Sequence, residues 1–126
     1  MSRCLRLEDV RPTQLYLSKE KLVAVLEWFD VDDPNYDSLP VFEHEGAWYF
    51  SDGHTRAFVA ALAGADTIRI HRDERVREEC DLEVYRTCID WCADEGIETI
   101  HDLSGRVVEP ETYEVCWIER CQRLGD

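Results

Sequence analysis

The chain has 126 residues, 44% of them apolar, which suits one compact domain or a small domain with an extension packed on it. Acidic side chains outnumber basic ones by 28 to 14 and no basic stripe is visible, so the net charge of −14 argues against nucleic acid and anionic membranes as partners. The chain shows neither a signal-peptide pattern at its start nor a run of ~20 apolar residues, so we expect a cytoplasmic protein that does not span a membrane.

Hydrophobic spacing predicts alternating strands and helices in the first part of the chain. Pro12 indicates a loop over 10–13, and Ser18 is a candidate N-cap for the first helix. The apolar face of that helix is formed by Leu22, Val25, Leu26 and Phe29. The expected elements, in order, are a strand at 3–7, a helix near 19–29, an acidic loop at 30–38, a hairpin from 40–43 and 47–50, a helix from Thr55 to Gly64, and a strand at 67–70. The predicted order is therefore β-α-β-β-α-β.

Residues 76–126 are predicted to form a helical extension. An almost wholly charged segment at 72–81 marks the boundary between it and the first part of the chain. The pattern indicates a helix ending near Gly96, a short helix at 97–103, a turn at 104–106 and a last helix starting at Pro110. The six cysteines lack zinc-site spacing, and most lie on apolar helix faces, so we interpret them as reduced, metal-free packing residues. The expected fold is α+β, with a domain at 1–75 and the helical extension at 76–126 packed on it.

The segment Asp52-Gly53-His54-Thr55-Arg56 lies where a strand turns into a helix. A helix N-terminus presents N–H groups without helical partners and a partial positive charge, so it can hold a phosphate. Gly53 lets the backbone approach a ligand closely, and Arg56 offers a forked cation. Asp52 suits a Mg²⁺ ligand, and His54 suits a phosphate donor or a proton carrier. The same letters also fit an ordinary Asp-Gly turn with a helix cap, and this alternative stays open.

A wider pattern resembles a known family. Gly53-His54-Thr55-Arg56, the alanine-rich helix after it, Gly64 and the strand Thr67–Ile70 are similar to the phosphate-binding box of the ParB/sulfiredoxin superfamily. The segment Val10–Leu22 resembles the first loop and helix of that family, so the resemblance spans residues 5–72. It implies a small nucleotide-binding α/β unit.

Departures from the family pattern narrow the expected function. His54 stands where sulfiredoxins have their reactive cysteine and where partition proteins have a glutamate, which argues against sulfinate repair and DNA clamping. The loop is most similar to that of the family's free serine kinases. This resemblance implies ADP or ATP with Mg²⁺, phosphoryl transfer to a small hydroxyl-bearing metabolite, and a carboxylate base on the first helix, for which Glu20 is the candidate. Lys19 and Lys21 would then meet the phosphates, although a solvated helix start explains them equally well.

The expected site combines these assignments. Its residues are Glu20, Asp52 and His54 for catalysis, Gly53, His54, Thr55, Arg56 and Lys21 for the phosphates, and Asp52 for Mg²⁺. Two alternatives remain. The chain is a non-catalytic sensor of nucleotides or anions, or it is an interaction module that contacts a protein partner through its acidic helical extension. Glu20 also has a purely structural interpretation, as a favourable charge at a helix start.

Overall fold

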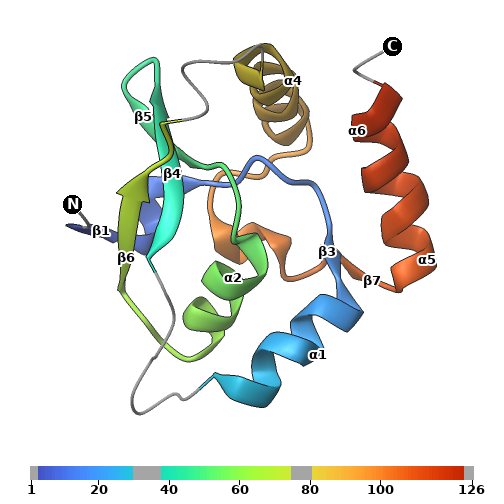
Figure 1. Cartoon of the computed structure of the whole chain (residues 1–126), viewed down its shortest axis with the longest axis horizontal. Helices are drawn as coiled ribbons and strands as arrows, with labels where there is room; N and C mark the ends of the chain where they lie inside the picture. Colours follow the sequence, from blue (N-terminus) through green and yellow to red (C-terminus); the bar gives the residue numbers. More distant parts are fainter. Residues whose placement is uncertain (1–2, 30–37, 75–80, 124–126) are drawn as a thin grey trace.

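The computed structural model describes residues 3–29, 38–74 and 81–123 and shows a mixed α+β fold. Within these residues the main sheet has five strands in the order β1-β6-β4-β5-β2, with parallel and antiparallel neighbours. The strands are β1 (Arg3–Arg6), β2 (Val10–Arg11), β4 (Leu39–His44), β5 (Ala47–Phe50) and β6 (Thr67–Arg72). Figure 1 shows this sheet on one side of the molecule and the longer helices on the other.

The helices follow the predicted order. Those of the first part are α1 (Lys19–Trp28) and α2 (His54–Leu62), with a single short turn η1 (Leu7–Asp9) before them. The extension contains α4 (Asp81–Asp94), η2 (Ile100–Leu103) and a continuous helical segment made of α5 (Pro110–Tyr113), the π-helical turn η3 (Glu114–Ile118) and α6 (Glu119–Arg123). The predicted helix from Pro110 is confirmed. No helix in the described parts of the chain combines the length and apolar character that crossing a membrane needs.

The predicted hairpin forms from β4 and β5 with a two-residue loop. Glu45 and Gly46 both have positive φ, at 51° and 82°. Such a loop matches the right-handed twist of the paired strands, and glycine at its second position takes the positive φ without strain. The pairing places Val41 opposite Phe50 and His44 opposite Ala47. The hairpin therefore delivers the end of β5 to the turn that leads into α2.

Three short strands were not expected. Val10–Arg11, predicted as loop, is β2, because it pairs in parallel with Trp48 and Tyr49 of β5. Strand β3 (Leu17–Ser18) pairs in parallel with β7 (Val107–Val108) of the extension. All three strands are two residues long, too short for a periodic pattern, so only long-range pairing reveals them. The acidic loop at 30–38 lies outside the described residues except for Ser38. Of the charged segment at 72–81, residues 75–80 lie outside the described residues.

Helix α1 begins where predicted but differs in two details. Ser18 occupies the N-cap position with φ −82° and ψ 127°, yet its side chain makes no capping hydrogen bond. Its side chain is buried, and the residue forms the end of β3. Leu26, assigned to the buried face, is 50% exposed, whereas Leu22 and Phe29 pack against the core and Val25 lines a cavity described below. The predicted apolar face of α1 was therefore wrong in including Leu26.

One hydrophobic core joins the two parts of the chain. Leu7, Leu17 and Phe50 from the first part belong to the same buried cluster as Ile100 and Leu103 from the extension. Cys88 and Cys92 are also buried in this cluster, which is the packing role predicted for them. The extension is therefore packed on the sheet domain through shared apolar side chains.

Replacing Leu103 tests whether this shared core is cooperative. Leu103 is fully buried, so Leu103→Ala should lower the free energy of unfolding by about 2–5 kcal/mol. Leu62→Ala is the matched control, because Leu62 is 61% exposed and its truncation should cost within about 0.5 kcal/mol. Urea unfolding followed by far-UV circular dichroism measures both. A separate early transition in Leu103→Ala, with the main transition unshifted, would show that the extension unfolds independently.

Candidate ligand-binding site

The turn between β5 and α2 requires glycine at its last position. Gly53 has a φ of 77°, in the left-handed region that residues with a Cβ rarely adopt. A Cβ built on it would lie 3.0 Å from both Leu39 Cδ2 and Arg56 Nη2. Gly53 is also the N-cap of α2, and a residue without a side chain cannot cap the helix. The start of α2 is thus left open to an outside acceptor.

The first hydrogen bond of α2 shows which backbone N–H groups lack an acceptor within the helix. Ala57 N donates to Gly53 O over 3.0 Å. The N–H groups of His54, Thr55 and Arg56 come earlier in the helix and have no acceptor within it. These donors carry the positive end of the helix dipole, a combination that favours an anion.

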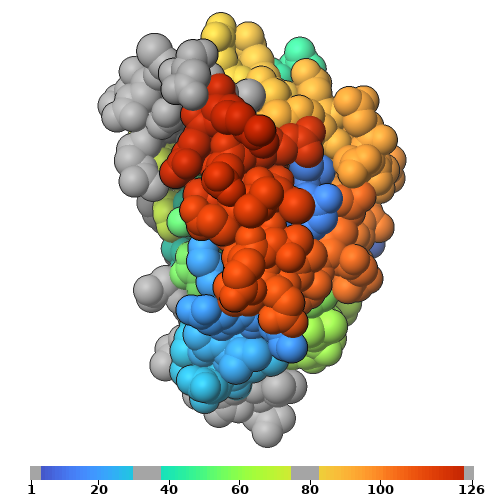
Figure 2. All heavy atoms as spheres, turned by 90° about the vertical axis from the view of Figure 1, so that its right-hand side faces the viewer, coloured from blue at the N-terminus to red at the C-terminus, as the bar shows by residue number. Residues whose placement is uncertain are grey.

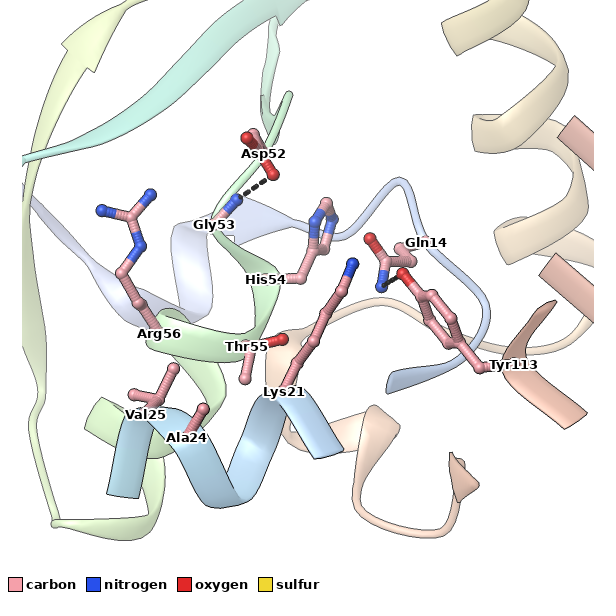
Figure 3. A pocket seen from close by; sticks show the side chains of 10 residues that line it. All are labelled: Gln14, Lys21, Ala24, Val25, Asp52, Gly53, His54, Thr55, Arg56 and Tyr113. Atoms are coloured by element: carbon pink, nitrogen blue, oxygen red, sulfur yellow. Dashed lines mark hydrogen bonds between the residues drawn. The ribbon is translucent and has the colours of Figure 1, made fainter. Parts of the chain in front are cut away.

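A cavity of about 360 Å³ lies at this turn. Its volume is in the lower part of the range for small-molecule sites. The lining residues come from the turn, α1, the segment between β2 and β3, and α5: Gln14, Lys21, Ala24, Val25, Asp52, Gly53, His54, Thr55, Arg56 and Tyr113. Figure 3 shows Lys21 rising from α1 toward His54, between Thr55 on one side and Gln14 and Tyr113 on the other. Segments 99 residues apart in the chain, at Gln14 and Tyr113, therefore build one cavity.

Two cations, Lys21 and Arg56, line this cavity. In the described residues no ion pair joins Lys21 or Arg56 to an acidic side chain. Lys19, two positions before Lys21, is by contrast paired with Glu109 at 3.3 Å. Lys21 Nζ instead lies 5.0 Å from the centroid of the Tyr113 ring, a cation–π distance. With Asp52 as its one carboxylate, the lining has an excess of positive charge in a chain of net charge −14.

His54 is a buried, neutral donor. Its side chain is 4% exposed, and its Nε2 accepts a hydrogen bond from the backbone N–H of Thr13 over 2.9 Å. Burial lowers the pKa of His54 from 6.5 to about 4, against a smaller opposite effect of the Asp52 carboxylate. In the neutral ring Nε2 holds the lone pair, so Nδ1 carries the proton. Nδ1 is buried and has no hydrogen-bond partner within the described chain, so its donor is unsatisfied.

The turn that carries Asp52 is held by hydrogen bonds from Gly53 and from residues elsewhere in the fold. The exposed Asp52 accepts a hydrogen bond from Gly53 N through Oδ1, over 2.8 Å. Ser51 Oγ donates to the buried carboxylate of Asp73 over 2.7 Å. Tyr85 Oη of α4 donates to Ser51 O over 3.0 Å. The residue after β6 and helix α4 of the extension therefore both hold the segment that carries Asp52 and Gly53.

The structure brings together most of the residues that the sequence singled out. Asp52, Gly53, His54, Thr55 and Arg56 line the cavity, and so does Lys21. Glu20 does not, and its exposed side chain lies one position before Lys21, about 100° round α1. The assignment of Glu20 as a base in this cavity is therefore not supported by its position. Within the described residues no group of three or more His, Cys, Asp or Glu side chains could hold a metal, so Asp52 would bind Mg²⁺ only with help from a ligand or water.

Four lining residues were missed. Ala24 and Val25 follow Lys21 at i+3 and i+4, so helical spacing could have assigned them once Lys21 was placed. Gln14 lies in a segment without periodicity, and Tyr113 is in the extension. Neither residue carries a local signal, because the contact between them depends on the packing of α5 against β3 and the segment before it.

The buried neutral state of His54 predicts an acid-sensitive stability. Because the folded protein disfavours the charged ring, this contribution is complete above pH 6.5 and is lost as the pH falls toward 4, by up to about 3 kcal/mol. His54→Gln keeps an acceptor for Thr13 N but does not titrate, so its free energy of unfolding should fall less over the same interval. Urea titrations between pH 4 and 7 give the two slopes, with the exposed His101→Gln as control. Identical slopes for wild type and His54→Gln would contradict the assignment.

Comparisons with known proteins concern the fold. No family model matches the chain, and no curated protein matches it. Among solved structures, the chain is similar to protein Atu1540 from Agrobacterium tumefaciens, with a TM-score of 0.54 and 16% sequence identity over 87% of this chain. It spans 63% of the length of Atu1540. At this identity the likeness shows a shared fold and nothing of function, so the resemblance to the ParB/sulfiredoxin superfamily stays a prediction.

Proposed function

We propose that the cavity at the start of α2 binds the phosphate groups of a small ligand, with a nucleotide such as ADP or ATP as the leading class. The observation that carries this proposal is the pair of cations, Lys21 and Arg56, which face one cavity with no ion-pair partner in the described chain. The N–H groups at the start of α2 add donors of the same polarity. Phosphate oxygens accept all of these hydrogen bonds.

Removing either cation should weaken this binding. Lys21→Gln and Arg56→Gln are each expected to reduce affinity for ADP by roughly tenfold, because each loses a charge-assisted contact. Lys19→Gln removes the same charge two residues away, from a side chain already paired with Glu109, and should change affinity little. Calorimetry with ADP, ATP and inorganic phosphate, with and without Mg²⁺, gives the affinities. If Lys19→Gln weakens binding as much as Lys21→Gln, the binding reflects a nonspecific effect of positive charge, and the proposed site is wrong.

Phosphoryl transfer to a hydroxyl-bearing metabolite is a second candidate. The observation in its favour is the carboxylate of Asp52 at the same cavity, with Oδ1 held by Gly53 N and Oδ2 directed to no partner in the described chain. That oxygen is available for Mg²⁺ or for an acceptor proton, and catalysis would otherwise depend on positioning and charge. Without transfer, the same site makes the protein a sensor of its ligand.

Two carboxylate variants separate these functions. If the protein transfers phosphate, Asp52→Asn should lower turnover by about 10²–10⁴-fold, because it removes the Mg²⁺ ligand or base. Glu20→Gln should leave turnover unchanged, since Glu20 does not line the cavity, and it serves as the control. Transfer from ATP to a panel of amino acids, sugars and polyols is measured by ADP release. A large loss in Glu20→Gln would restore it as the base, and no transfer by wild type would favour the sensor.

A further inference from the structure

The hydrogen bonds of Gln14 fix the direction of its amide. Gln14 Nε2 lies 2.7 Å from the Tyr16 carbonyl oxygen and 2.9 Å from Tyr113 Oη. A carbonyl oxygen can only accept, so the atom facing it is the amide nitrogen. Both N–H groups of that nitrogen are thereby used, and Oε1 is left as an acceptor without a partner among the described residues. Figure 3 shows this oxygen directed toward His54 and the ammonium group of Lys21, inside the cavity.

The hydroxyl of Tyr113 provides a hydrogen-bond donor beside the Gln14 acceptor. Its Oη accepts from Gln14 Nε2, so its own proton is not used in that bond. The side chain is 6% exposed, and burial raises the pKa of Tyr113 to about 12, so the hydroxyl keeps its proton at neutral pH. An acceptor, Gln14 Oε1, and a donor, the Tyr113 hydroxyl, therefore stand next to each other on one wall.

This pair lies away from the expected phosphate position. In Figure 3, Gln14 and Tyr113 stand on one side of His54 and Arg56 stands on the other, with Lys21 between the two groups. A ligand whose phosphate meets the start of α2 and Arg56 would extend toward Gln14 and Tyr113. The two polar groups there would lose their water and would need new partners from the ligand.

We propose that Gln14 and Tyr113 select a hydroxyl group of the ligand, which donates to Gln14 Oε1 and accepts from Tyr113 Oη. A hydroxyl has a donor and acceptor lone pairs on one atom, so it satisfies both groups at once. An alkyl group in its place would leave both buried groups unpaired. The inference rests on the proposed phosphate site and narrows its ligands to hydroxyl-bearing phosphate esters, either ribonucleotides or phosphorylated polyols.

Matched ligand pairs test the proposal by calorimetry. The probes are inorganic phosphate, glycerol 1-phosphate against propyl phosphate, and ADP against 2′,3′-dideoxy-ADP. The hydroxylated member of at least one pair should bind on the order of tenfold more tightly than its deoxy partner. The pair that shows this ratio distinguishes a polyol phosphate from a ribonucleotide. In Tyr113→Phe and in Gln14→Leu the ratio should fall toward one, while the affinity for inorganic phosphate stays as in wild type.

The control is Tyr16→Phe, which removes a neighbouring tyrosine hydroxyl that is not part of this cavity and should keep the wild-type ratio. Two variants at separate positions keep the test decisive if one of them fails to fold, as thermal unfolding will show. Equal affinities within both pairs, with inorganic phosphate bound, overturn this inference and leave the phosphate site standing. A ratio that survives in both variants also overturns it. Failure of every probe to bind overturns the phosphate site and this inference together.

Discussion

The hydrogen bond from Thr13 N to His54 Nε2 connects two segments that lie 41 residues apart, and the geometry of the site depends on it. It holds the segment between β2 and β3 against the first residue of α2, in a buried place where water cannot substitute for it. It also sets the tautomer of His54, because an accepting Nε2 leaves the proton on Nδ1. Thr13 Oγ1 strengthens the same junction by donating to Phe50 O over 2.6 Å. Gln14, the next residue, is thereby brought to the cavity wall.

The helical extension takes part in the site as well as in the core. Tyr113 of α5 forms one wall of the cavity, and Tyr85 of α4 hydrogen-bonds to Ser51 behind the turn. In Figure 2 the C-terminal helical segment lies directly beside the blue N-terminal segments, over the face that is turned to the viewer. Strands β3 and β7 link the same two parts through their backbones. A small sheet domain that buries limited surface by itself gains both stability and a complete site from such packing.

Charge is distributed unevenly in this chain. Acidic side chains are twice as numerous as basic ones, and some cations in the described chain are paired with carboxylates, as Lys19 is with Glu109 and Arg106 is with Glu95. Lys21 and Arg56 differ from these two because they face a cavity whose lining, in the described part of the chain, includes Asp52 as its one carboxylate. The net charge of −14 would oppose the approach of any anion, so an anion that bound there would depend on short-range contacts more than on long-range attraction.

Local sequence patterns were sufficient to predict the order of the longer strands and helices and the position of the turn at 52–56. Gly53 is required by backbone geometry, and the strand before it and the helix after it have clear periods, so local chemistry was sufficient there. Glu20 and Lys21 look equivalent as sequence, and only the rotation of α1 against α2 decided that Lys21 faces the cavity. The contacts of Gln14 with Tyr113 and of Thr13 with His54 were likewise decided by tertiary structure. Such pairs carry no local periodicity, because the free energy that forms them comes from packing between segments far apart in the chain.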